Sequence, residues 1–153
     1  MQLVFSGHYD RDPGLDSYIM ALTDDKQGQI NEWSVTSSHV NGQQRGDQHT
    51  WGGLIPPVHH VRNLDKYEVL LIPEDSSDVV GVGGSFYRIL PYKVTTKNGT
   101  DRSALGIHRD ANNPGSLGCI VMNDFNFTDF ETTMANLRRE YHVDRIPLFV
   151  FYS

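Results

Sequence analysis

The stretch TDFETTMANLRREY, residues 128 to 141, predicts one α-helix in a chain whose other segments favour strands. Thr128 and Glu131 form a T-x-x-E capping box, in which two side chains satisfy main-chain N–H groups at the start of a helix. The apolar residues that follow recur at helical spacing and form one stripe that would pack against a sheet: Phe130, Met134, Leu137 and Tyr141. We therefore expect a single main helix in the C-terminal half.

The rest of the chain is rich in short segments of β-forming residues separated by Gly, Pro, Asn and Asp, which favour turns. These segments predict strands over residues 1–9, 17–23, 29–37, 58–63, 66–73, 86–94, 104–108, 117–122 and 145–153. Between them, residues 41–57 are polar and then rich in Gly and Pro, which predicts a long loop. The fold class expected is mainly β, a barrel or sandwich with one helix, built as a single domain over residues 1–153.

The overall charge argues against several classes of partner. The chain has 153 residues and a formal net charge of −6, and its Lys and Arg residues are thinly spread. A protein whose main partner is nucleic acid would favour a basic stripe, so we expect no nucleic-acid partner. No apolar run approaches the roughly 18 residues of a membrane span, so we expect no membrane insertion. The first residues, MQLVFSGHYD, lack the features of a signal peptide, which predicts synthesis in the cytoplasm.

The stretch GIHRDANNPGSLGCIVM, residues 106–122, holds the single cysteine, Cys119, eleven positions after His108. A free cysteine is often a small buried hydrophobe, and that interpretation stays open here. An imidazole on an adjacent strand, however, would allow a thiolate–imidazolium pair, which lowers the thiol pKa and makes the sulfur a nucleophile. Gly118 would allow another group to approach the main chain closely, and successive N–H groups around it could hold an oxyanion. Composition and spacing favour the two interpretations about equally.

Metal and cofactor sites are not expected. The chain has seven histidines, but His59 and His60 are neighbours on a predicted strand and would point to opposite faces. No H-E-x-x-H pattern or paired-cysteine spacing is present.

The segment from Ser116 to Met122, with the upstream stretch RSALGIHRD, resembles the catalytic signature of the L,D-transpeptidases, the YkuD-like family. In that signature a histidine on one strand precedes a Ser/Thr-x-Gly-Cys-apolar run. Two positions depart from the usual Ser-His-Gly-Cys-x-Arg core, because Leu117 replaces its second histidine and Val121 replaces its arginine. Without these two residues, the pattern resembles that of a divergent branch of the family, which includes secretion-system effectors and phage-borne domains. The resemblance implies an L,D-transpeptidase-like β-sandwich or barrel.

The resemblance also implies roles for individual residues. Cys119 would attack the carbonyl of a peptidoglycan stem peptide and form a thioester, while His108 takes the thiol proton and returns it to the leaving amine. The N–H groups of Gly118 and Cys119 would hold the oxyanion. Arg109 or Arg102 would bind a substrate carboxylate, and Asp110 would orient His108. Ser116 would also help to bind the substrate or to orient the catalytic groups.

The function expected is therefore a cysteine-dependent peptidoglycan-modifying enzyme that needs no cofactor. Water or an amine would resolve the thioester, as in an L,D-carboxypeptidase or an L,D-transpeptidase. Because peptidoglycan lies outside the cytoplasmic membrane, such a protein would reach the periplasm or cell wall by phage or secretion-system delivery. The alternative is a non-catalytic β-domain of a virion or cell-wall-binding assembly, in which Cys119 is merely buried.

Overall fold

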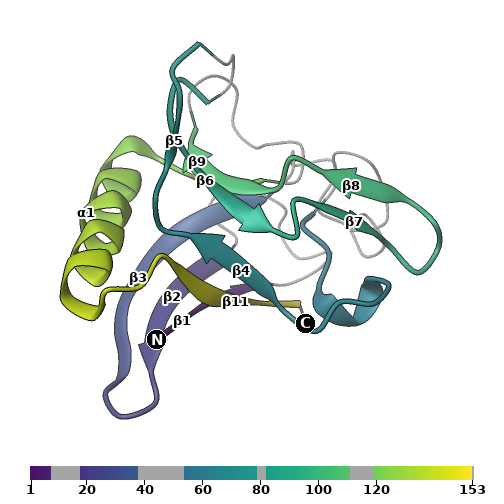
Figure 1. Cartoon of the computed structure of the whole chain (residues 1–153), viewed down its shortest axis with the longest axis horizontal. Coiled ribbons are helices and arrows are strands. Elements are labelled where there is room, and N and C mark those ends of the chain that lie inside the picture. Colours follow the sequence, from purple (N-terminus) through teal and green to yellow (C-terminus); the bar gives the residue numbers. More distant parts are fainter. Residues whose placement is uncertain (8–17, 38–53, 79–81, 111–118, 153) are drawn as a thin grey trace.

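The computed structural model describes residues 1–7, 18–37, 54–78, 82–110 and 119–152. Strands dominate these residues, and the single α-helix, α1 (Asp124–Tyr141), lies in the C-terminal half (Figure 1). The expectation of a mainly β fold with one helix is confirmed. The strands are β1 (Gln2–Gly7), β2 (Tyr18–Asp24), β3 (Gly28–Ser37), β4 (Tyr67–Leu70), β5 (Glu74–Ser76), β6 (Gly84–Leu90), β7 (Lys93–Thr95), β8 (Asp101–Ser103), β9 (Gly106–Arg109), β10 (Ile120–Met122) and β11 (Arg145–Tyr152).

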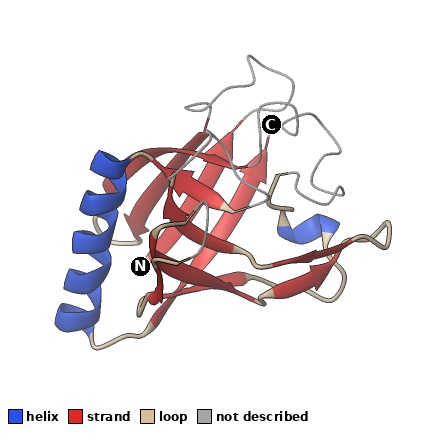
Figure 2. Ribbon diagram, turned by 90° about the horizontal axis from the view of Figure 1, so that it is seen from above, coloured by secondary structure: helices blue, strands red, loops and turns tan. Residues whose placement is uncertain are grey.

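The main sheet has nine strands in the order β4-β11-β1-β2-β3-β10-β9-β6-β5. Strand β4 also pairs with β6, through Glu68 opposite Leu90 and Val69 opposite Ile89, so the sheet closes on itself as a barrel. Strands β7 and β8 form a separate two-stranded sheet. This hairpin and α1 lie at opposite sides of the molecule in both views (Figures 1 and 2).

The barrel interior is filled by alternate residues of its strands, as the two-residue period of a strand requires. Those of β6, β9 and β10 that join the hydrophobic core are Tyr87, Ile89, Ile107, Ile120 and Met122. The residues between them point to the outer face, yet Phe86, His108 and Val121 are buried there as well. This part of the barrel is therefore buried on both faces.

Helix α1 packs against the barrel through its buried residues Phe127, Phe130, Met134 and Leu137. The ring of Phe130 meets the rings of Trp33 and Tyr87 edge-on, each at a centroid distance of 5.2 Å. Asp129 accepts hydrogen bonds from Trp33 Nε1 at 2.8 Å and Asn31 Nδ2 at 2.9 Å, which ties the helix to β3. None of the described helices is long and apolar enough to cross a membrane.

The start of the helix and one end of its stripe differ from the prediction. The helix begins at Asp124, and its N-cap is Asn123, whose side chain accepts a hydrogen bond from the N–H of Asn126. The capping box predicted at Thr128 is wrong, because Thr128 already lies one turn inside the helix and its hydroxyl donates to the carbonyl of Asp124. Tyr141, expected in the stripe, is 48% exposed.

Two strand predictions also need correction, and two short strands were not predicted. Residues 58–63 form no strand, because Val58–His60 is a 3-10 helix with Pro57 as its N-cap. The strand predicted over 86–94 is interrupted after Leu90, where Pro91 cannot donate to a ladder, and continues as β7. The short polar strands β5 and β8 had no apolar pattern from which to predict them.

Candidate active site

The structure places His108 on β9 and Cys119 just before the neighbouring strand β10. Strand β10 runs parallel to β9, with Ile120 opposite Ile107 and Val121 opposite His108. The same register puts Cys119, just before β10, beside Gly106. Cys119 and His108 thus fall on one face of the sheet, two residues apart along it, and standard strand spacings separate their Cα atoms by about 8 Å.

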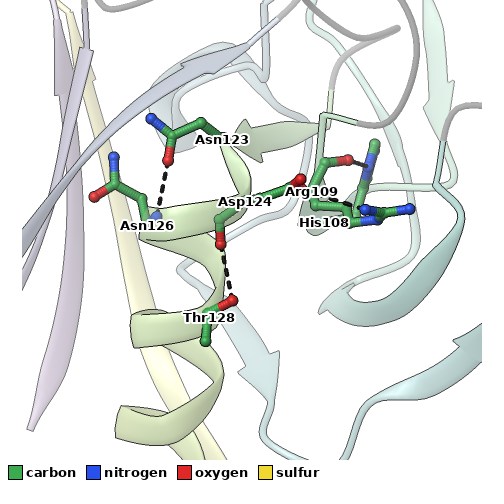
Figure 3. A network of polar contacts seen from close by, with 6 residues as sticks. All are labelled: His108, Arg109, Asn123, Asp124, Asn126 and Thr128. Carbon is green, nitrogen blue, oxygen red and sulfur yellow. Dashed lines mark hydrogen bonds and ion pairs between the residues drawn. The ribbon is translucent and has the colours of Figure 1, made fainter.

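His108 is held in one orientation by a main-chain carbonyl. Its Nδ1 lies 2.7 Å from the carbonyl oxygen of Arg109 (Figure 3). Because a carbonyl can only accept, Nδ1 carries the proton and Nε2 of the neutral ring has a free lone pair. This is the tautomer that a general base needs.

Burial also keeps the imidazole neutral. His108 is 6% exposed, and its ring stacks on that of Phe86. This burial lowers the pKa of His108, and the hydrogen bond to Arg109 opposes the shift only in part. The ring is therefore unprotonated at neutral pH and ready to accept a proton.

The thiol of Cys119 is protonated at neutral pH. It donates to the carbonyl oxygen of Ala104 at 3.1 Å, and the main-chain N–H of Gly106 donates to the sulfur. Burial raises the pKa of the thiol to about 11, whereas the Gly106 N–H and the charge of Arg102 lower it by less. Desolvation thus disfavours both charges of the thiolate–imidazolium pair expected from the sequence.

Ala104, whose carbonyl oxygen accepts the hydrogen bond from the thiol, has an unusual backbone. Its φ is 59°, in the left-handed region that residues with a Cβ seldom adopt. The residue lies between β8, which carries Arg102, and β9, which carries His108. This turn brings the carbonyl oxygen of Ala104 to the sulfur.

Arg102 lies in the interior beneath this turn. It is 2% exposed, and its Nη1 donates to the carbonyl oxygen of Leu54 at 2.8 Å. Two tyrosines hold the next two carbonyls, with Tyr152 donating to Ile55 and Tyr67 donating to Pro56, each at 2.7 Å. Arg102, expected to contact a substrate carboxylate, is instead buried, and its charge contributes to the surroundings of Cys119.

Arg109 has a different position. Its guanidinium forms an ion pair with Asp124 at the start of α1, with Nη1 and Oδ1 3.3 Å apart, and its side chain is 38% exposed (Figure 3). It remains accessible to an anionic substrate. Asp110 was expected to orient His108; the partner of His108 Nδ1 is the carbonyl oxygen of Arg109, and the main-chain N–H of Asp110 donates to the carbonyl oxygen of Met122. Ser116 and Gly118 lie outside the described residues.

Sequence reasoning missed three contributors to the site. The Arg109 and Ala104 carbonyls are main-chain groups, so their roles cannot be predicted from residue type. Phe86 belongs to a predicted strand, but the sequence gives no sign of which ring it contacts.

Among the residues that the structure describes, no three His, Cys, Asp or Glu side chains are grouped so that they could hold a metal ion. No family model, curated protein or solved structure matches this chain.

Proposed function

We propose that the chain is a cysteine acyl-transfer enzyme acting on peptidoglycan stem peptides. The observation that supports the chemistry best is the oriented, neutral His108 on the strand beside Cys119, on the same face of the barrel. The sequence resemblance to the L,D-transpeptidases supports the choice of substrate. No cofactor enters the proposed reaction.

In this proposal the Cys119 thiol turns from the Ala104 carbonyl toward Nε2 of His108 as substrate binds. His108 takes the thiol proton while the sulfur bonds to the substrate carbonyl carbon, and the resulting oxyanion is held by main-chain N–H groups. As the tetrahedral intermediate collapses, the carbon–nitrogen bond breaks and His108 returns the proton to the leaving amine. Water or a second amine then attacks the thioester carbonyl, which releases the acyl group and regenerates the Cys119 thiol.

Arg109 is the arginine of this site that remains available to a substrate carboxylate. Its exposed guanidinium lies at the end of β9 beside the start of α1, where a substrate carboxylate could replace or share its partner Asp124. The place of action that follows from this substrate is the bacterial periplasm or cell wall, reached by phage or secretion-system delivery.

The test is incubation of the protein with purified stem peptides and muropeptides, followed by mass analysis of the products. Loss of a terminal residue would indicate carboxypeptidase action, and its exchange or cross-linking would indicate transpeptidase action. Cys119→Ala should abolish either product while the protein remains folded. Absence of any product with the wild-type protein would contradict the proposed function.

A second candidate, a non-catalytic β-domain of a virion or cell-wall-binding assembly, is favoured by one observation. The thiol is protonated and hydrogen-bonded to Ala104, as in a structural cysteine. This candidate predicts that Cys119→Ala changes no binding or assembly property, and that no acyl-enzyme forms.

A further inference from the structure

Phe86 lies against His108 and over Gly106, the residue whose N–H donates to the Cys119 sulfur. Strand β6 runs antiparallel to β9 with Tyr87 opposite Ile107, so Phe86 lies opposite His108 on the outer face. The two rings stack at a centroid distance of 6.0 Å and an interplanar angle of 24°. Phe86 is 8% exposed and is not part of the hydrophobic core inside the barrel.

The tip of the same ring rests on Gly106. A Cβ at Gly106 would lie 2.1 Å from Cζ of Phe86, so the ring fills the space that a side chain would otherwise occupy. Gly106 is also the residue whose N–H holds the Cys119 sulfur. One aromatic ring therefore covers the main chain beside the thiol at its tip and contacts the imidazole at its face.

We propose that Phe86 is a positioning residue that covers Gly106 in the resting state and must move before Cys119 and His108 can act together. The inference rests on the proposed function, in which this pair is catalytic. A carbonyl attacked by Cys119 has to lie near the sulfur and near Nε2, and the space over Gly106 on that side is filled by the ring. Rotation of the Phe86 side chain between staggered conformers opens this space without a change in the main chain.

The cover also contributes to the desolvation of this region. A ring that lies on the imidazole and over the main chain beside the thiol disfavours the charged form of each. Removing the ring should shift the pKa of Cys119 down and that of His108 up, toward their ordinary values. A role limited to barrel stability would shift neither.

The experiment measures the rate of iodoacetamide alkylation of Cys119 against pH in the wild-type protein and in Phe86→Ala. We expect the variant profile to move by about one pH unit to lower pH, which is about a tenfold faster reaction at pH 7. NMR titration of His108 should show a higher pKa in the same variant. Phe86→Leu, which keeps an apolar cover, should stay close to the wild type.

Two further variants make the result decisive. Ile89→Ala truncates a buried residue of the same strand that points into the barrel, so it controls for general loosening. Gly106→Ala keeps Phe86 but displaces its ring, and should move the alkylation profile in the same direction as Phe86→Ala. Wild-type profiles in folded Phe86→Ala and Gly106→Ala, or an equal shift in Ile89→Ala, would overturn the proposal.

Alkylation and the His108 titration need no substrate. A failure of the proposed function would therefore show separately, as absence of stem-peptide products.

Discussion

Unfolding the protein in urea should make Cys119 about a hundredfold more reactive toward iodoacetamide at pH 7. The structure raises the pKa of the thiol from 9.0 to about 11, and this difference changes the thiolate fraction at neutral pH by about two powers of ten. Only the thiolate reacts at an appreciable rate. In the native protein the rate should therefore rise about tenfold for each pH unit and level off only near pH 11.

The sign of this effect follows from the balance of forces on the sulfur. Burial favours the neutral thiol, and neither the Gly106 N–H nor the charge of Arg102 compensates for it. Because the thiol pKa is higher in the folded state, this group favours folding below pH 9. Its contribution to stability is then lost as the pH rises from about 9 to 11.

The assay is pseudo-first-order alkylation followed by intact mass, for the native and urea-unfolded wild type and for native His108→Ala. Because His108 is neutral and its Nδ1 is bound to Arg109, its removal should leave the native profile almost unchanged above pH 8. A native rate that is already at a plateau between pH 6 and 8, and that collapses in His108→Ala, would refute the reasoning. It would show that the resting site holds a thiolate–imidazolium pair.

Three other predictions follow from the geometry. Asn123→Ala should lower the free energy of unfolding by about 1 kcal/mol, because Asn123 caps α1. Thr128→Ala, which removes no cap, should leave it nearly unchanged. Urea denaturation of both variants measures the two losses, and equal losses would contradict the prediction. Tyr67→Phe should cost about 1 kcal/mol in the same assay, because the buried Pro56 carbonyl loses its donor, and a neutral result would contradict it. Stem-peptide turnover should persist below pH 6.5, since burial lowers the pKa of His108 and the base protonates only in more acidic solution; a half-maximal rate above pH 7 would contradict this.

Much of the element order could be predicted because strands and the helix have local signatures. The β-forming residues of 17–23 and 29–37 became β2 and β3, and the apolar stripe from Phe130 to Leu137 became the buried face of α1. The closure of the barrel could not be predicted, because it depends on β4 pairing with β6, a contact between strands about 20 residues apart in sequence with no local pattern. The helix start was placed too late because Asn123 is one of several residues that can cap.

The candidate site was predictable only in its side chains of distinctive chemistry. Cys119 and His108 stand out by residue type, and the parallel pairing of β9 and β10 brings them together. Burial was not predictable: Arg102, expected to bind a substrate carboxylate, lies inside, and desolvation raises the pKa of the thiol. A lone sequence segment does not show which groups exclude water from it, and that exclusion decides the charge state of the pair.

The most direct test of the central claim is capture of an acyl-enzyme on Cys119. The protein is mixed with a purified tetrapeptide stem, quenched in acid within the turnover time, and examined by intact mass and peptide mapping. The proposed function predicts an added mass equal to the stem minus its terminal D-amino acid, located on Cys119 and absent from Cys119→Ala. An unmodified wild-type protein, with the stem peptide also unchanged after prolonged incubation, would contradict it.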